Sequence, residues 1–100
     1  MSEVLLTLVM PDDVAQHVQD LLLSRPDLVA GFTAYRAEGH GAGVALVAPG
    51  ERVSGHAPRT GIQAVGSEEG MRALLALIKR ELPGAKLFFW LLPAIEVGRL

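Results

Sequence analysis

The stretch from Gly31 to Gly43, GFTAYRAEGHGAG, combines closely spaced glycines with a histidine at the end of a strand pattern. Gly39, Gly41 and Gly43 permit positive φ angles and carry no side chain to keep a ligand away from the backbone. We therefore predict that residues 39–43, called the glycine corner below, present backbone N–H groups to a small ligand or an anion. The alternative is that these glycines only let the chain leave the strand.

His40 and His56 flank the segment that follows the corner and are the candidate metal ligands. Imidazole binds copper, zinc and nickel, although a firm metal site usually has three or four ligands with further support around them. The chain has no H-x-x-x-H spacing, and it has no cysteine, which excludes thiolate ligands and disulfides. One hypothesis is therefore a metal site at His40 and His56. The other is that both are exposed loop residues that bind no metal.

The elements that position these residues can be predicted from hydrophobic periodicity. Val4–Met10 and Lys86–Leu92 are apolar at both alternating sets of positions, as in strands covered on both faces. Apolar residues at helical spacing predict one helix that has Arg25 in its last turn and stops at Pro26, and another that begins after Ser67 as N-cap. The remaining predicted strands are about Ala30–Glu38, Thr60–Val65 and a short final one at Ala94–Val97.

This order of elements predicts an α+β, ferredoxin-like βαββαβ sandwich, with one four-stranded antiparallel sheet and two helices on one face. We expect a single domain over residues 1–100, with a long flexible loop at about 42–58 that has neither strand nor helix period. Two helices cover only one face of the sheet, yet the first and last strands are apolar on both. The second face is therefore expected to meet another subunit.

Composition narrows the classes of function. Half of the 100 residues are hydrophobic, the net charge is −2, and the mean hydropathy is +0.34. Lys and Arg are scattered, which argues against nucleic-acid binding. No apolar run approaches the roughly 18–20 residues of a membrane span, and the first residues resemble no export signal, so we expect a cytoplasmic protein that is not itself membrane-embedded. No nucleophile has an oriented base and acid near it, so we expect no enzyme activity.

Three segments resemble the PII superfamily of trimeric signalling proteins. They are Pro-x-x-Val-x-x-x-Val at Pro11–Val18, the GFTAYRAEGHG strand and corner, and KLFFWLLPAIEV at Lys86–Val97. Members of the superfamily have a G-[ML]-T strand that leads through G-x-G into a long mobile loop, and a late K-[IL]-F strand. The GHG corner, the FFW strand and the end AIEVGRL are most similar to a small PII-like family encoded beside heavy-metal efflux pumps.

The resemblance implies a homotrimer that binds its ligand in clefts between subunits. Thr33 matches the Thr of the superfamily that reaches this cleft, and Lys86 matches a Lys of the turn that wraps nucleotide phosphates. That turn is reduced here to Pro83–Lys86, so the usual ATP-binding turn is missing. A nucleotide and a divalent metal are both candidate ligands. The alternative for Thr33 is an ordinary strand residue without a ligand, and the alternative for Lys86 is an exposed charge at the start of a strand.

By this resemblance we expect a non-enzymatic PII-like signalling protein. A ligand would bind at inter-subunit clefts lined by the glycine corner and Lys86, and the long loop would control a partner such as a membrane transporter or efflux pump. The main alternative is a CutA-like divalent-metal-binding or tolerance protein with the same trimeric scaffold. A third hypothesis is a structural adaptor whose loop binds a protein without any small ligand.

Overall fold

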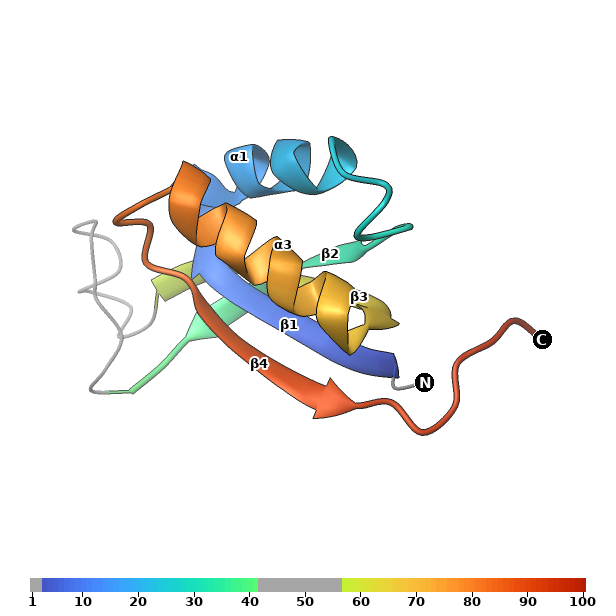
Figure 1. Cartoon of the computed structure of the whole chain (residues 1–100). Helices are drawn as coiled ribbons and strands as arrows, with labels where there is room; N and C mark the ends of the chain where they lie inside the picture. The colour runs from blue at the N-terminus through green and yellow to red at the C-terminus, as the bar shows by residue number, and fades with distance from the viewer. Residues whose placement is uncertain (1–2, 42–56) are drawn as a thin grey trace.

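The computed structural model describes residues 3–41 and 57–100 (Figure 1). One antiparallel sheet carries two helices on one of its faces, which confirms the predicted α+β, ferredoxin-like architecture. Within the described residues, no helix is both long and apolar enough to cross a membrane. The elements are β1 (Glu3–Pro11), α1 (Asp12–Leu23), β2 (Thr33–Gly39), β3 (Ala57–Ser67), α3 (Glu68–Glu81) and β4 (Phe88–Pro93).

The sheet has the strand order β2-β3-β1-β4, so β1 and β3 are central and β2 and β4 form the edges. All neighbouring pairs are antiparallel. The register places Pro11 opposite Arg59, Val9 opposite Phe88, and Gly39 opposite Ala57. The end of β2, the start of β3, the end of β1 and the start of β4 therefore share one end of the sheet.

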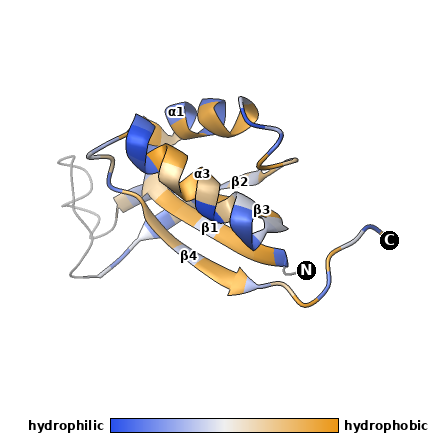
Figure 2. Ribbon diagram, in the orientation of Figure 1, coloured by the Kyte–Doolittle hydropathy of each residue, from blue (hydrophilic) through white to orange (hydrophobic). Residues whose placement is uncertain are grey.

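The core lies between the helices and the two central strands. Both helices pack mainly on β1 and β3, because alternate residues of these strands are apolar and point to the helix side. Figure 2 shows the apolar colouring of β1 beneath α3. The largest fully buried apolar side chains are Leu6, Leu8, Met10, Val18, Leu22, Ile62, Met71 and Leu74.

Helix α3 begins where the sequence predicts. The Ser67 side chain accepts a hydrogen bond from the Gly70 N–H at 3.0 Å, which satisfies one of the N–H groups left open by the first turn. Acidic residues occupy the first turn and Lys79 and Arg80 the last, in agreement with the helix dipole. The predicted N-cap at Ser67 is thus confirmed.

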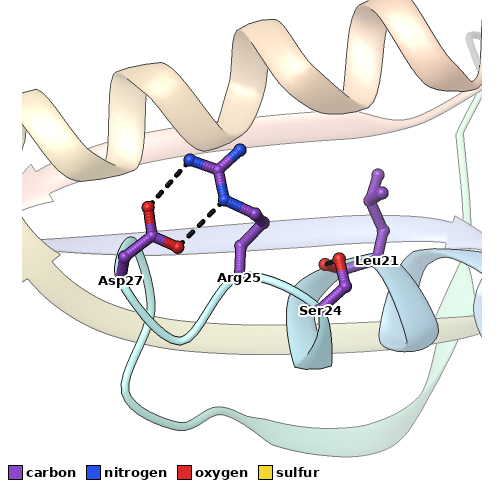
Figure 3. Close-up of polar contacts among 4 residues, drawn as sticks. All are labelled: Leu21, Ser24, Arg25 and Asp27. Carbon is purple, nitrogen blue, oxygen red and sulfur yellow. Dashed lines mark hydrogen bonds and ion pairs between the residues drawn. The ribbon is translucent and has the colours of Figure 1, made fainter.

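Helix α1 ends earlier than predicted. It stops at Leu23, so the expectation that Arg25 lies in its last turn is wrong. The Ser24 hydroxyl donates to the Leu21 carbonyl at 2.6 Å, and Arg25 instead forms a two-point ion pair with Asp27 at 2.9 and 2.8 Å (Figure 3). The side-chain hydrogen bond from Arg25 lowers the pKa of Asp27 below its usual value.

Three strand boundaries also differ from the prediction. Strand β2 starts at Thr33 rather than about Ala30, and β4 starts at Phe88 rather than Lys86. Strand β3 covers Ala57–Ser67, so Ala57 and Pro58, which were assigned to the loop at about 42–58, belong to a strand. The rest of that predicted loop lies outside the described residues.

The short final strand predicted at Ala94–Val97 is absent from the described structure. The Ala94 N–H donates to the Glu3 carbonyl at 3.0 Å, and the chain then leaves the sheet (Figure 1). Ile95 and Leu100 are fully exposed, and Val97 is largely so. A strand needs a partner for its backbone groups, and after residue 94 the described chain offers none.

The sheet face opposite the helices, called the open face below, is apolar along β1 and β4. The register aligns Phe88, Trp90 and Leu92 with Val9, Thr7 and Leu5, so these side chains share the open face. Phe88 is 68% exposed, Trp90 39% and Leu92 49%. The prediction that both faces of these strands are apolar is confirmed.

Tyr35 covers the backbone of β3 on the same open face. It pairs with Gly61, and a Cβ placed on Gly61 would lie 2.3 Å from the Tyr35 Cζ. The ring therefore lies in the space that a side chain at position 61 would need. A glycine is required there for this close approach.

Candidate functional site

The glycine corner begins where β2 loses its partner. Gly39 is the last residue of β2 and pairs with Ala57, and His40 and Gly41 follow outside the strand. Gly41 has a φ of +115°, a region that L-residues with side chains rarely adopt, and among the described residues no atom beyond its chain neighbours lies within 4 Å of where its Cβ would be. Gly43, the last glycine of the predicted site, lies outside the described residues.

His40 lies beside a carboxylate. Its Nε2 is 3.2 Å from Glu38 Oε1, and both side chains are exposed. A carboxylate in contact with an imidazole orients the ring, as it does behind many metal-ligating histidines. His56, its predicted partner in a metal site, lies outside the described residues. Among residues 3–41 and 57–100, no three His, Asp or Glu side chains lie together in a group able to hold a metal ion.

A polar hollow adjoins the corner. It has a volume of about 380 Å³ and is lined by Arg36, Ala37, Glu38 and Pro58. Next to it, the Thr60 hydroxyl, which is opposite Arg36 in the β2–β3 register, donates to Asp12 Oδ1 at 2.9 Å. A guanidinium and a carboxylate on one rim can contact anionic and cationic groups of a polar ligand respectively.

The structure does not bring the corner and Lys86 together within one chain. Both lie at the same end of the sheet, because Gly39 ends the edge strand β2 and Lys86 precedes the other edge strand, β4. Edge strands of a four-stranded sheet are about 14 Å apart, since neighbouring strands are separated by about 4.8 Å. Lys86 is exposed. Within one chain, the corner and Lys86 therefore lie on opposite edges of the sheet.

Thr33 is also remote from the corner. It is the first residue of β2, opposite Gln63, while Gly39 is the last. With a rise of about 3.3 Å per strand residue, Thr33 and Gly39 are about 20 Å apart. Thr33 is exposed on the open face, on the row that contains Thr7 and Trp90. The predicted site residues thus occupy three separate places on one chain.

The family of the chain follows from a comparison with protein-family profiles. The profile described as "Protein of unknown function (DUF3240)" matches residues 1–100. The chain belongs to the DUF3240 family. A crystal structure of a DUF3240 family protein from Shewanella baltica OS155 has a TM-score of 0.80 and 18% identity to it, covering 100% of this chain and 98% of that one. A search of curated proteins gave no match.

Solved structures place this DUF3240 protein in the PII-like fold that the sequence predicts. CPII from Thiomonas intermedia K12, a nitrogen regulatory PII-like protein bound to ADP, AMP and bicarbonate, has a TM-score of 0.71 and 20% identity, covering 100% and 97% of the two chains. The periplasmic divalent cation tolerance protein CutA from Archaeoglobus fulgidus has a TM-score of 0.71 and 10% identity, covering 97% and 88%. At these identities the likeness concerns the fold alone.

Sequence reasoning on the DUF3240 chain missed the polar residues beside the corner. Arg36 and Glu38 are two residues apart on β2 and so share a face, a signal that strand periodicity could have supplied. The hydrogen bond between Thr60 and Asp12 joins residues 48 positions apart, and no local pattern indicates such a contact. The hollow forms only where the pairing of β2 with β3 brings Pro58 next to Arg36 and Glu38.

Proposed function

We propose that this DUF3240 protein is a PII-like regulatory protein. It assembles as a homotrimer, binds a small ligand at clefts between subunits, and controls a partner through the segment at about 42–58. The observation that carries this proposal is the separation of the glycine corner from Lys86. The two lie at one end of the sheet but on opposite edges, an arrangement that supports a site shared with a second chain.

The open face supports assembly. Large exposed apolar side chains on adjacent strands are typical of protein interfaces, and a monomer rarely leaves such a patch uncovered. Phe88, Trp90 and Leu92 form such a patch on β4. Ile95 and Val97, in the segment that follows β4, are also exposed apolar residues. Copies that cover one another here would bury these side chains.

A cyclic assembly would also complete the ligand site. In a ring, each interface joins one edge of a subunit to a different edge of the next. If the β2 edge of one copy meets the β4 edge of its neighbour, the corner at Gly39–Gly41 faces the neighbour's turn that contains Lys86. Backbone N–H groups, the Lys86 ammonium and the Arg36 guanidinium would then favour an anionic ligand.

Titration calorimetry tests the ligand. We expect heat from at least one of ADP, AMP and bicarbonate, the compounds present in the CPII structure. Lys86→Gln should weaken that binding because it removes the cation of the cleft. Arg80→Gln is the matched control, since Arg80 is an exposed cation that contacts Glu81 at the end of α3. Absence of heat from all three compounds, or equal effects of the two variants, would contradict the proposal.

The second candidate is a CutA-like metal-tolerance function. It is favoured by the contact of His40 with Glu38 and by the shared fold with CutA. It predicts binding of Zn²⁺ or Cu²⁺ that disappears in a His40→Ala, His56→Ala double variant. His17→Ala, which removes an exposed histidine from α1, should leave metal binding intact. Metal binding that survives the double variant excludes this site.

We further propose that the protein acts in the cytoplasm, without catalysis, on a membrane transporter such as an efflux pump. The PII-like fold supports this role, because its ligand-bound state could present the 42–58 segment differently to a partner. Co-purification with the partner should change when the ligand identified by calorimetry is added. Co-purification that is indifferent to that ligand would instead indicate a structural adaptor.

A further inference from the structure

The helix side of the sheet has a second cavity, distant from the glycine corner. Because both helices pack mainly on the central strands, the edge strand β4 is only partly covered. A cavity of about 510 Å³ lies between the C-terminal half of α3, the turn at residues 83–85 and β4. Its volume is within the range of about 300–1,000 Å³ typical of small-molecule sites.

The wall of this cavity is mostly apolar. Leu75 and Ile78 line it from α3, Phe89 lines it from β4, and the buried Leu8 of β1 contributes to it. Phe89 is 50% exposed, although it points to the helix side, so its ring is available to pack against a ligand. The hollow beside β2, in contrast, is lined by a guanidinium and a carboxylate. An apolar ligand would therefore bind in the cavity between α3 and β4 rather than in the polar hollow beside β2.

Lys79 is the one charged residue among those that line the cavity within the described chain. It is exposed and forms no ion pair with another described residue, whereas the next residue, Arg80, contacts Glu81 at 3.4 Å. Lys79 can therefore place its ammonium at the rim while its methylene chain packs on the apolar wall. Among the described residues that line the cavity, none has a carboxylate to compete for that ammonium.

We propose that this cavity binds a free medium-chain fatty acid, with the acyl chain between α3 and β4 and the carboxylate at Lys79. The charge of the rim favours an anion over a neutral or cationic amphiphile of the same length. A single lining cation does not form the basic cluster that attracts a membrane surface, so a free acid is preferred over a bilayer lipid. This proposal does not depend on the regulatory function proposed above.

Decanoate is a suitable probe, and binding can be followed by changes in the amide NMR signals of the full chain. The signals of Leu75, Ile78 and Phe89 should shift with saturation at concentrations below micelle formation. Ala76→Phe, at an exposed position that lines the cavity, should fill it and weaken binding about tenfold or more, the equivalent of about two methylenes no longer buried. Ala85→Phe fills the same cavity from the turn and provides a second variant should the first unfold.

The head group is tested separately. Lys79→Gln should weaken decanoate binding about three- to fivefold, as expected for an exposed ion pair, and Arg80→Gln should leave it unchanged. Decanol and decyltrimethylammonium should bind more weakly than decanoate to the unaltered protein. Equal effects of Lys79→Gln and Arg80→Gln, or equal binding of the three amphiphiles, would overturn the assignment of the carboxylate to Lys79.

Two further results would overturn the acyl-chain site. One is decanoate binding that neither cavity-filling variant reduces. The other is decanoate binding that weakens as the protein concentration is raised, since a second copy of the chain would then compete for the cavity.

Discussion

Replacement of Phe88 by serine should dissociate the proposed assembly while the single chain stays folded. Phe88 lies on the open face and is 68% exposed. A fully buried aromatic side chain removes about 200 Å² from water, so covering the exposed two-thirds of Phe88 would bury about 130 Å². At about 25 cal/mol per Å² this contributes up to about 3 kcal/mol per subunit, or more than a hundredfold in association.

Leu23→Ser is the matched control. Leu23 is 69% exposed, which nearly equals the exposure of Phe88, but it lies at the end of α1 and not on the sheet. Both variants exchange an exposed apolar side chain for the same small polar one. Sedimentation velocity over a range of protein concentrations measures the mass of the assembly, and urea unfolding of each variant checks that the chain is intact.

We expect the unaltered protein and Leu23→Ser to sediment as trimers and Phe88→Ser to shift to single chains. If the unaltered protein sediments as one chain at all concentrations, the reasoning from the open face is refuted. It is also refuted if Phe88→Ser and Leu23→Ser assemble equally well. In the first case the glycine corner and Lys86 would have no second chain to join them. In the second case the chains would assemble through a surface other than the open face.

Three further predictions concern the folded chain. Thr7 is fully buried and its hydroxyl has no hydrogen-bond partner among the described residues, so Thr7→Val should raise the free energy of unfolding by about 1 kcal/mol in urea titration; a loss of stability would contradict this. Ser67→Ala should lower the free energy of unfolding by about 1 kcal/mol in the same titration, because it removes the N-cap bond to Gly70. The Arg25 side chain lowers the pKa of Asp27, so the pair stabilises the fold above the unfolded pKa of Asp27 and loses this effect as pH falls through the folded pKa. Arg25→Gln should therefore raise the pKa of Asp27 towards its ordinary value in an NMR titration, and an unchanged pKa would show that the ion pair is absent in solution.

The elements with a strong local signal were predicted well. Strand β1 was expected at Val4–Met10 and covers Glu3–Pro11, because its residues are apolar on both faces. Helix α3 was expected from its apolar stripe and from Ser67, whose side chain does cap it. In both elements the deciding interactions lie within a few residues of each other.

Contacts between distant segments explain what the sequence did not show. Strand β3 includes Pro58, Gly61 and Gly66, which disfavour strands, and it extends to Ala57–Ser67 because β1 and β2 pair with it on both sides. The early end of α1 coincides with the ion pair of Arg25 outside the helix. Local sequence propensity predicts neither the strand pairing of β3 nor the ion pair of Arg25.

The sequence predicted individual residues of the candidate site but not how they are arranged in space. The glycines and Lys86 were identified by residue type and by resemblance, and Gly41 does adopt the positive φ that a glycine permits. Their distribution over opposite edges of the sheet depends on the strand order, which no single motif encodes. The polar hollow at Arg36 and the apolar cavity at Lys79 likewise form only when separate elements pack together.

The close approach of Tyr35 to Gly61 has a practical consequence for protein engineering. Replacement of a strand glycine by alanine is a common way to stabilise a domain, but here the new methyl group would displace an aromatic ring. Either the Tyr35 ring shifts, or the two positions are redesigned as a pair, for instance by combining alanine at 61 with a smaller residue at 35. A mutational library that varies position 61 alone would miss the combinations in which a smaller residue at 35 leaves room for the new side chain.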